Sequence, residues 1–293
     1  MLKISLITPS FKQGRYIERT IRSVLLQDYP ELEYIMMDGG STDSTAEVLQ
    51  KYQEHFAHCQ SAPDKGQADA IARGFEQSTG EIMAYLNSDD LLAPDTLRFV
   101  NQFFSEHPKV DALYSHRVSI DENDRVIWHW LLPVHINYML KRWDYIPQET
   151  CFWRRRLFER AGNIDTSYRF AMDYDLFARY MKVGTFRRVN RFLAAFRVHS
   201  ESKTTKDFKT IGMEEFHLVW DRNGIKWRPI DFFLQTWFVE LASLQGIRFG
   251  ALRKQLPGAF AGIGYDYNDF WGGLLKEQPS LTSEKNSDRP PGR

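Results

Sequence analysis

The N-terminal part of the chain alternates between two hydrophobic periods. Short apolar runs typical of strands lie at residues 2–8, 32–38, 58–62 and 81–86. Between these runs, apolar side chains recur at helical spacing after Gly14, after Gly40 and over residues 67–77. Ser41 and Asp43 are suitable N-cap residues for the helix that follows Gly40. Strand and helix in strict alternation predict an α/β fold with parallel strands, right-handed crossovers and helices on both faces of the sheet.

The middle of the chain is less regular and rich in aromatic residues. Between Pro108 and Pro147 the large aromatic side chains are Tyr114, Trp128, Trp130, Tyr138, Trp143 and Tyr145. Such rings pack in a core or stack on the apolar face of a sugar, and the sequence leaves both alternatives open. Residues 154–161 and 173–183 have helical spacing, and residues 186–198 are typical of a strand.

Towards the C-terminus the pattern becomes helical again. Residues 230–252 carry apolar side chains near helical spacing with basic residues before and after them. Their charge-free core, residues 232–239, is far shorter than the ~20 apolar residues needed to span a bilayer. This helix either packs on the main domain or lies in a membrane surface, its basic ends on anionic lipid. Residues 276–293 are polar and Pro-rich, typical of a disordered tail. We therefore expect a core domain at 1–205, a C-terminal helical extension at 206–275 and a tail at 276–293.

Composition excludes several classes of protein. Lys plus Arg and Asp plus Glu both number 38, so no net charge attracts nucleic acid. The two cysteines are far apart, and we expect both to be core thiols in a reducing compartment. The apolar run before Pro9 is too short for a signal peptide. We therefore expect a cytoplasmic protein.

Two adjacent carboxylates, Asp89 and Asp90, follow the apolar run that ends at Leu86. Adjacent carboxylates repel each other, and a divalent cation neutralises them, so the pair indicates a metal site. The alternative is that one of them caps a helix starting near Pro94. Ligands of open α/β sheets bind beyond the carboxyl ends of the strands. The other expected strands end in polar residues too, at Thr8–Ser10, Asp38 and Asp64–Gly66.

The glycine-rich phosphate loops of two nucleotide-binding classes are missing from the sequence. No GxGxxG follows these strands, and no GxxxxGK[ST] occurs in the chain. A dinucleotide-binding Rossmann site and a P-loop are therefore disfavoured, and a site built on carboxylates and a metal is favoured.

Four short segments in order, Ile7–Phe11, Met37–Asp43, Pro63–Gln67 and Leu86–Asp90, together resemble the family 2 glycosyltransferases. The resemblance extends over residues 2–205. It implies the GT-A fold, with a Rossmann-like, mostly parallel central sheet and helices on both faces. It also implies an inverting transferase that uses nucleotide-diphosphate sugars.

The resemblance implies the residues of the donor site. Thr8, Pro9, Ser10, Asp38 and Asp64 correspond to positions that hold the nucleotide, and Lys65 could approach the diphosphate. For Asp38 and Asp64 the alternative is a turn residue, and for Lys65 a solvated loop lysine.

Asn87, Ser88 and Asp89 occupy the place of the family's Asp-x-Asp motif, from which Asn87 departs. Asp89 is the expected ligand of Mn²⁺ or Mg²⁺. His199, in a segment that resembles the family's His-x-x-Ser, is the second ligand, and the alternative for it is a surface histidine.

The acceptor side is implied in the same way. Asp173 corresponds to the catalytic base, although Met172 stands where the family has Glu. An N-cap is the alternative for Asp173, whereas Asp175 either caps the helix or holds an arginine. Gln148 and Glu149 could hydrogen-bond acceptor hydroxyls.

The sequence is thus interpreted as a metal-dependent inverting glycosyltransferase, of hexosyltransferase type, in polysaccharide or glycolipid assembly. Its acceptor would be a saccharide or lipid-linked saccharide, with peripheral contact to the inner membrane face through residues 230–254. One rival is a catalytically inactive sugar-nucleotide-binding protein of the same fold. The other is a nucleotidyltransferase, which would need a richer phosphate loop than Lys12 and Gly14 provide.

Overall fold

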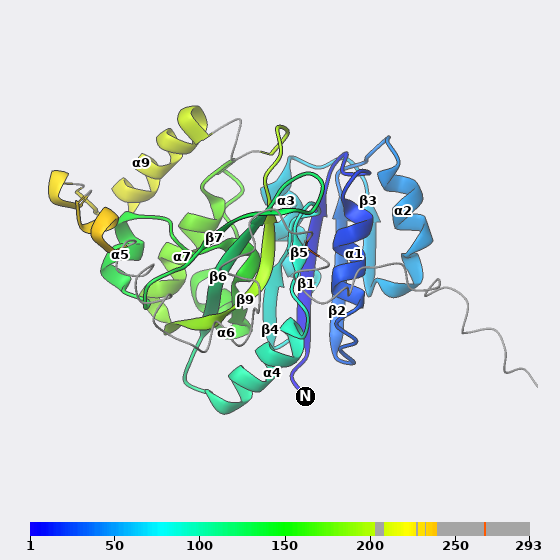
Figure 1. Cartoon of the computed structure of the whole chain (residues 1–293), viewed down its shortest axis with the longest axis horizontal. Coiled ribbons are helices and arrows are strands. Elements are labelled where there is room, and N and C mark those ends of the chain that lie inside the picture. Colours follow the sequence, from blue (N-terminus) through cyan, green and yellow to red (C-terminus); the bar gives the residue numbers. More distant parts are fainter. Residues whose placement is uncertain (203–207, 227, 232, 239–266, 268–293) are drawn as a thin grey trace, which may run out of the picture.

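The computed structural model describes residues 1–202, 208–226, 228–231, 233–238 and 267. Within them, nine strands form one mixed sheet (Figure 1): β1 (Ile4–Ser10), β2 (Leu32–Asp38), β3 (His58–Ser61), β4 (Ile82–Tyr85), β5 (Leu91–Leu92), β6 (Ala112–Ile120), β7 (Val126–Trp130), β8 (Phe152–Arg154) and β9 (Phe186–Arg197). The α-helices are α1 (Ile17–Leu25), α2 (Thr45–Lys51), α3 (Gln67–Gln77), α4 (Thr96–Glu106), α5 (Asn137–Arg142), α6 (Arg155–Ala161), α7 (Met172–Val183) and α9 (Met213–Arg222). Shorter helical turns are η1 (Gln53–His55), η2 (Gln148–Thr150) and η3 (Phe208–Gly212).

The N-terminal half of the sheet has the predicted parallel arrangement. Its strands lie in the order β3-β2-β1-β4, and each neighbouring pair is parallel. The other half is mixed, because β8 is antiparallel to both β4 and β6 while β9 is parallel to β6. Antiparallel β7 and β5 complete it, on β6 and β9 respectively. The parallel strands place their carboxyl ends at one edge of the sheet.

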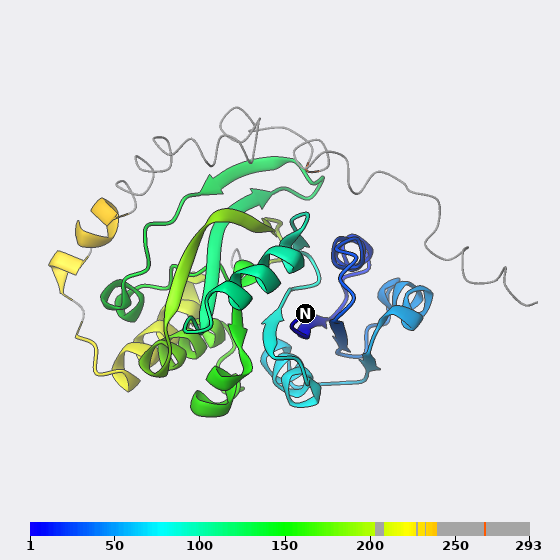
Figure 2. The same ribbon diagram turned by 90° about the horizontal axis from the view of Figure 1, so that it is seen from below.

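Two hydrophobic cores lie on the two faces of the sheet. Ile4 and Leu6 of β1 point into the core under α1, α2 and α4, whereas Ile7 points into the core under α3, α6 and α7. This alternation follows from the two-residue period of a strand. All three side chains are almost fully buried, and each such side chain contributes about 1.5–3 kcal/mol by its removal from water. Figure 2 shows helices on both sides of the sheet, as predicted.

Several local expectations are corrected. Ser41 is not a helix cap: α2 begins at Thr45, and the Ser41 hydroxyl instead donates to Asp38 at 2.5 Å. Asp89 and Asp90 do not cap a helix either, since they lie between β4 and β5 and α4 begins only at Thr96. Helix capping is therefore excluded as the alternative explanation of the two adjacent carboxylates.

The cysteines and the aromatic residues divide between core and surface. Cys151 is buried, but Cys59 is exposed, so only one of the two is a core thiol. Tyr114 and Tyr145 are core residues, which accords with packing, whereas Trp128 on β7 is 57% exposed.

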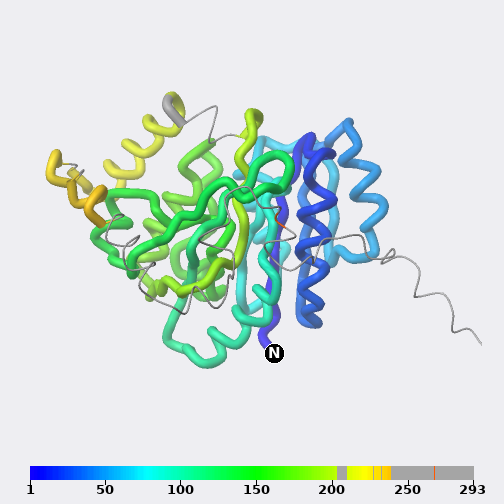
Figure 3. The backbone as a smooth tube through the Cα atoms, viewed as in Figure 1, coloured from blue at the N-terminus to red at the C-terminus, as the bar shows by residue number. Residues whose placement is uncertain are grey.

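Helix α7 and strand β9 form one continuous helix–strand unit, joined at Gly184 and Thr185 (Figure 3). A Cβ atom at Gly184 would lie 2.3 Å from Cδ2 of Leu157, so the turn has no room for a side chain. The strand then runs along β6 and pairs at its C-terminal part with β5.

Helix α9, in the segment expected to be a C-terminal extension, packs against α7. Val219 of α9 is buried in the core that includes α7. Glu215 of α9 accepts three 2.7 Å bonds from the backbone N–H groups of residues 169–171, directly before α7. The extension therefore fixes the start of α7.

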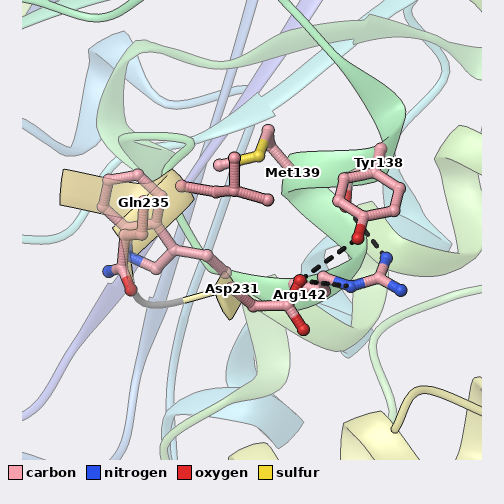
Figure 4. A pocket seen from close by; sticks show the side chains of 7 residues that line it. Tyr138, Met139, Arg142, Asp231 and Gln235 are labelled. Atoms are coloured by element: carbon pink, nitrogen blue, oxygen red, sulfur yellow. Dashed lines mark hydrogen bonds and ion pairs between the residues drawn. The ribbon is translucent and has the colours of Figure 1, made fainter. Parts of the chain in front are cut away.

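A second contact holds Asp231 against α5. Asp231 accepts a bond from the Tyr138 hydroxyl at 3.1 Å and lies 3.4 Å from Nε of Arg142. These side chains line a small pocket between the two segments (Figure 4). In the described residues no helix is both long and apolar enough to cross a membrane. The expected tail at 276–293, and residues 239–252 of the expected helix, lie outside the described residues.

Candidate active site

The carboxyl ends of β1 and β2 bring the first two motifs together. Asp38 accepts bonds from the hydroxyls of Ser41 and Ser61 and from the backbone N–H groups of Gly40 and Ser41. Such bonds are typical of an Asx turn, so Asp38 shapes the loop after β2. Ser10 Oγ is buried and has no hydrogen-bond partner among the described residues. It is therefore available to a ligand at the end of β1.

The third segment, Pro63–Gln67, lies against the second, Met37–Asp43. Asp64 accepts a bond from the Gly66 N–H at 2.8 Å, as a turn residue does. A Cβ atom on Gly39 would lie 3.0 Å from Asp64 Oδ2 and 3.2 Å from the Phe11 ring, so three segments converge at this glycine. Lys65 is exposed. Thr8 and Pro9 are buried within β1, and the Thr8 hydroxyl lies 3.2 Å from that of Tyr34.

Asn87 connects α3 to η2 beyond the end of β4. Its side-chain oxygen accepts a bond from Gln67 at 2.7 Å, and its amide nitrogen donates to Gln148 Oε1 at 3.2 Å and to Asp90 at 3.4 Å. An aspartate has no donor and could make neither of the last two bonds. This gives a physical reason for the departure from the Asp-x-Asp pattern. Ser88, the next residue, is buried and bonds through its carbonyl to Thr20.

Asp89 and His199 meet although 110 residues separate them. The Nε2 atom of His199 lies 2.9 Å from Oδ2 of Asp89, and the Tyr16 ring packs 4.9 Å from the imidazole. Two ligands in adjacent positions of an octahedral ion with bonds of ~2.1 Å lie about 3 Å apart. The two side chains are hydrogen-bonded to each other at this distance, and one small divalent cation could take the place of that bond. No group of three or more His, Cys, Asp or Glu side chains suited to a metal is found among the described residues.

Arg197 holds the loop that carries Asp89. Its guanidinium is buried and donates to the carbonyls of Asp89 and Asp121 and to the carboxylate of Asp124. Its backbone N–H donates to Asp90, which is fully buried. Burial, and then the charges of Asp89 and Glu149, raise the pKa of Asp90 well above its ordinary value. Asp90 thus supports the loop from inside the protein.

The side chains of Gln148 and Glu149 bond within the protein. Gln148 donates to the Tyr85 carbonyl at 2.6 Å, and Glu149 accepts two 2.7 Å bonds from Arg117 of β6. The guanidinium of Arg117 also lies 4.5 Å from the Phe196 ring of β9. Both predicted acceptor residues therefore lie at the site, where they order neighbouring groups.

Asp173 occupies the first turn of α7, beside Arg117. It is not the N-cap, which is Ala171, and its Oδ1 accepts the Tyr174 N–H at 2.9 Å. Burial raises the pKa of Asp173 to about 6, against the lowering effects of that bond and of the Arg117 charge. A carboxyl group with this pKa is ionised at neutral pH yet more basic than an exposed aspartate. Asp175 instead pairs with Arg179 at 2.7 Å.

Asp144 is a site residue that sequence reasoning missed. It follows α5, and its Oδ1 is buried without a hydrogen-bond partner among the described residues. Burial and the charge of Asp173 raise the pKa of Asp144 well above its ordinary value, against the effect of Arg117. Arg117 and Arg197 were missed as well. No motif marks Asp144 or Arg117, but Arg197 stands two residues before His199 and could have been considered.

Comparison with known proteins places this geometry in a family. Residues 5–166, more than half of the chain, match the model of glycosyl transferase family 2. The chain belongs to this family. The nucleotidyltransferase alternative is therefore set aside, and sugar transfer is the chemistry that the family supports.

This family 2 member is similar in sequence to one known protein and in structure to two others. An uncharacterized glycosyltransferase of Nostoc sp. is 29% identical over 217 residues, which are 68% of this chain and 65% of that protein. The crystal structure of S. aureus TarS 1-349 in complex with UDP-GlcNAc matches with a TM-score of 0.62 and 16% identity, over 94% of this chain and 80% of that one. A mannosyltransferase from Pyrobaculum calidifontis, in complex with GDP-Man and Mn²⁺, matches with a TM-score of 0.57 and 18% identity, over 93% and 84%. The GT-A fold predicted from the sequence is thereby confirmed.

Proposed function

We propose that this protein transfers a sugar from a nucleotide-diphosphate sugar to an acceptor hydroxyl, with inversion and with the help of a divalent cation. The observation that carries the proposal is the pair of Asp89 and His199, 2.9 Å apart. A chain of contacts leads from the loop that carries Asp89 towards Asp173. Asn87 of this loop donates to Gln148, and the neighbouring Glu149 pairs with Arg117, whose charge acts on Asp173. The proposed cation ligands and the proposed base thus belong to one connected group of side chains.

The donor would bind at the carboxyl ends of β1, β2 and β4. Ser10 offers a buried hydroxyl with no partner among the described residues, and Asp38 and Asp64 order the loops around it. The related structures contain UDP-GlcNAc in one case and GDP-Man with Mn²⁺ in the other, which supports a nucleotide-sugar donor here. Lys65 is exposed and could reach a diphosphate.

Asp89 and His199 would hold Mn²⁺ or Mg²⁺. Oxygen and imidazole nitrogen are suitable ligands for these ions, and the remaining positions would go to diphosphate oxygens and water. When bound, the cation supplies charge stabilisation to the departing diphosphate. Arg197 supports the site because it fixes the backbone of Asp89.

Asp173 would be the general base. Its Oδ1 accepts the Tyr174 N–H, which leaves Oδ2 to take the proton of the acceptor hydroxyl as the glycosidic bond forms. Because the pKa of Asp173 is about 6, the base form predominates at neutral pH. Inversion needs only one such carboxylate on the acceptor side.

The acceptor, we propose, is a saccharide or lipid-linked saccharide in polysaccharide or glycolipid assembly. Peripheral contact with the inner membrane face would use residues 230–254. Ile230, Leu234 and Trp237 are 52%, 38% and 65% exposed, next to the basic Arg228. Exposed apolar side chains beside a positive charge are suited to an anionic lipid surface.

A thermal-shift panel tests the donor site. UDP, GDP and dTDP are each added with Mn²⁺ or with EDTA, since a ligand that binds only the native state raises the melting temperature. We expect one nucleotide to stabilise the protein in Mn²⁺ and much less in EDTA. Release of that nucleotide from its sugar conjugate then separates the enzyme from an inactive binding protein. If none of the nucleotides shifts the melting temperature under either condition, the proposal fails.

A further inference from the structure

Tyr267 is buried in the core domain, although it belongs to the expected C-terminal extension at residues 206–275. Its side chain is 2% exposed and packs in a hydrophobic cluster formed by β5, β6, β7 and β9. The residue lies beyond the family match, which ends at residue 166. No step of the proposed function has used this tyrosine so far.

The hydroxyl of Tyr267 holds the backbone of β5. It donates to the Leu92 carbonyl at 2.6 Å. Strand β5 consists of only two residues and is the last strand in the order of the sheet, beside β9. Because the Ala93 N–H donates to the Leu193 carbonyl of β9, the alternation of an antiparallel ladder turns the polar groups of Leu92 away from β9. The Leu92 carbonyl therefore depends on a partner from outside the ladder.

Strand β5 is attached directly to the loop of the proposed metal site. Asp89 and Asp90 precede it without an intervening residue. The Leu92 N–H donates to Ser23 Oγ of α1 at 3.1 Å, whereas its carbonyl accepts from Tyr267. Two side chains, one from α1 and one from the C-terminal part of the chain, thus fix the position at which the Asp89 loop continues into the sheet.

The backbone of Tyr267 holds the turn between β6 and β7. Its N–H donates to the Asp124 carbonyl at 2.6 Å. Asp124 has a φ of 64°, a left-handed conformation that residues other than glycine rarely adopt. The Asp124 carboxylate accepts a 2.6 Å bond from Arg197 and lies 3.1 Å from Nε of Arg19. Since Arg197 donates to the Asp89 carbonyl, the second bond of Tyr267 leads to the same loop as the first.

The same contacts extend to the second proposed metal ligand. The Arg197 guanidinium lies 4.8 Å from the centre of the Tyr16 ring, and this ring packs 4.9 Å from the imidazole of His199. His199 also follows Arg197 by only two residues. Both proposed ligands are therefore positioned by groups to which Tyr267 is connected.

We propose that Tyr267 is a positioning residue for the metal site: its hydroxyl and its backbone N–H hold β5 and the β6–β7 turn, and so keep Asp89 in place beside His199. This inference rests on the proposed role of Asp89 and His199 as ligands of Mn²⁺ or Mg²⁺. Tyr267 is not itself a ligand but acts through Leu92 and Asp124. A residue beyond the family match thus contributes to the affinity of the site for its cation.

Calorimetric titration of the full chain tests this role. The titrant is whichever of UDP, GDP and dTDP the thermal-shift panel selects, in Mn²⁺ and in EDTA. Tyr267→Phe removes only the bond to Leu92 and should weaken binding in Mn²⁺ about threefold. Tyr267→Ala also removes the ring and should weaken it at least about tenfold, with binding in EDTA unchanged in both variants. Native affinity of both variants in Mn²⁺, or equal losses in Mn²⁺ and EDTA, would overturn the proposal.

The matched control is Tyr29, another buried tyrosine. Its hydroxyl donates to the Leu2 carbonyl at 2.6 Å, before the start of β1 and thus at the end of that strand opposite the site. Tyr29→Phe therefore removes the same kind of bond and should lower the melting temperature as Tyr267→Phe does, but leave binding in Mn²⁺ unchanged. If both variants weaken binding in Mn²⁺ equally, the effect is a general loss of stability and the positioning role is wrong.

Hydrogen–deuterium exchange without any ligand separates this inference from the proposed function. Relative to the amides of β2 in the same sample, those of residues 89–93 should exchange at least about tenfold faster in Tyr267→Ala but not in Tyr29→Ala. Tyr267→Phe, with a smaller increase, replaces the alanine variant if that one does not fold. A wild type that binds no nucleotide would refute the proposed function, and exchange then decides alone: faster exchange supports the hold of Tyr267 on the loop, and unchanged exchange overturns it.

Discussion

Replacement of Asp173 by asparagine should abolish transfer and at the same time stabilise the protein. The pKa of Asp173 rises from an ordinary value of 3.8 to about 6 in the fold. A difference of about 2 units at ~1.36 kcal/mol each corresponds to about 3 kcal/mol of unfolding free energy that the ionised carboxylate removes. Because the side chain is only half-buried, we expect about 1–3 kcal/mol. Asparagine retains an oxygen for the Tyr174 N–H and has no charge to bury.

The sign of this effect gives it a pH dependence. Below pH 3.8 the carboxyl group is protonated in both the folded and the unfolded state, so its charge costs nothing. Between pH 3.8 and about 6 the unfolded state ionises first, and the folded state loses stability relative to it. Above about pH 6 the carboxyl group is ionised in both states, and the unfolding free energy is lowered by the full amount. The stability advantage of Asp173→Asn should thus be small at pH 4 and reach its full value by pH 7.

Urea unfolding of both proteins at pH 4 and pH 7 measures this difference, and a donor-turnover assay measures the loss of transfer. Removal of the base should lower kcat by about 10²–10⁴-fold. The matched control is Asp175→Asn on the same helix. Asp175 is fully buried and paired with Arg179 and Arg222, so its replacement should destabilise by about 3 kcal/mol. If Asp173→Asn destabilises the protein to the same extent at both pH values, or transfers at the native rate, the reasoning is refuted.

Three further substitutions test the donor side. His199→Ala should weaken nucleotide binding in Mn²⁺ at least about tenfold but leave binding in EDTA unchanged, measured by calorimetry; equal losses under both conditions would remove His199 from the metal site. Asn87→Asp should lower the unfolding free energy by about 1–3 kcal/mol, because a carboxylate cannot donate to Gln148 and places a charge beside Asp90; an unchanged urea midpoint would contradict this. Arg197→Met should destabilise by about 3–5 kcal/mol and weaken Mn²⁺-dependent binding; a variant with native affinity would show that Asp89 needs no such support.

The sequence predicted the parts of the fold that depend on local periodicity. The helix expected over residues 67–77 has these bounds in the structure, and the polar residues at the ends of β1, β2 and β4 lie where parallel strands place them. The pairing of Asp89 with His199 followed from a motif resemblance and not from spacing. The mixed half of the sheet was not predicted, because the pairing of β6 with β9 joins segments some seventy residues apart.

The remaining site residues depend on tertiary contacts that no local pattern contains. The guanidinium of Arg197 donates to the carbonyl of Asp89, and to the carbonyl of Asp121 and the carboxylate of Asp124 in the turn between β6 and β7. The pKa of Asp144 depends on the charges of Asp173 on α7 and Arg117 on β6, and both of these residues are distant from it in sequence. Ser41 was expected to cap a helix, but its hydroxyl oxygen accepts the Lys12 N–H while its hydroxyl group donates to the Asp38 carboxylate.

The helix–strand unit formed by α7 and β9 has a consequence for how the enzyme could fail. Asp173 lies in the first turn of α7 and His199 follows the C-terminal end of β9, so the turn at Gly184 connects the segments that carry the proposed base and the proposed metal ligand. A side chain at Gly184 would overlap Leu157, so either Leu157 or the turn between α7 and β9 would have to shift. We expect such a variant to bind a nucleotide as the wild type does and yet to misplace Asp173 relative to His199, although the changed residue contacts neither of them.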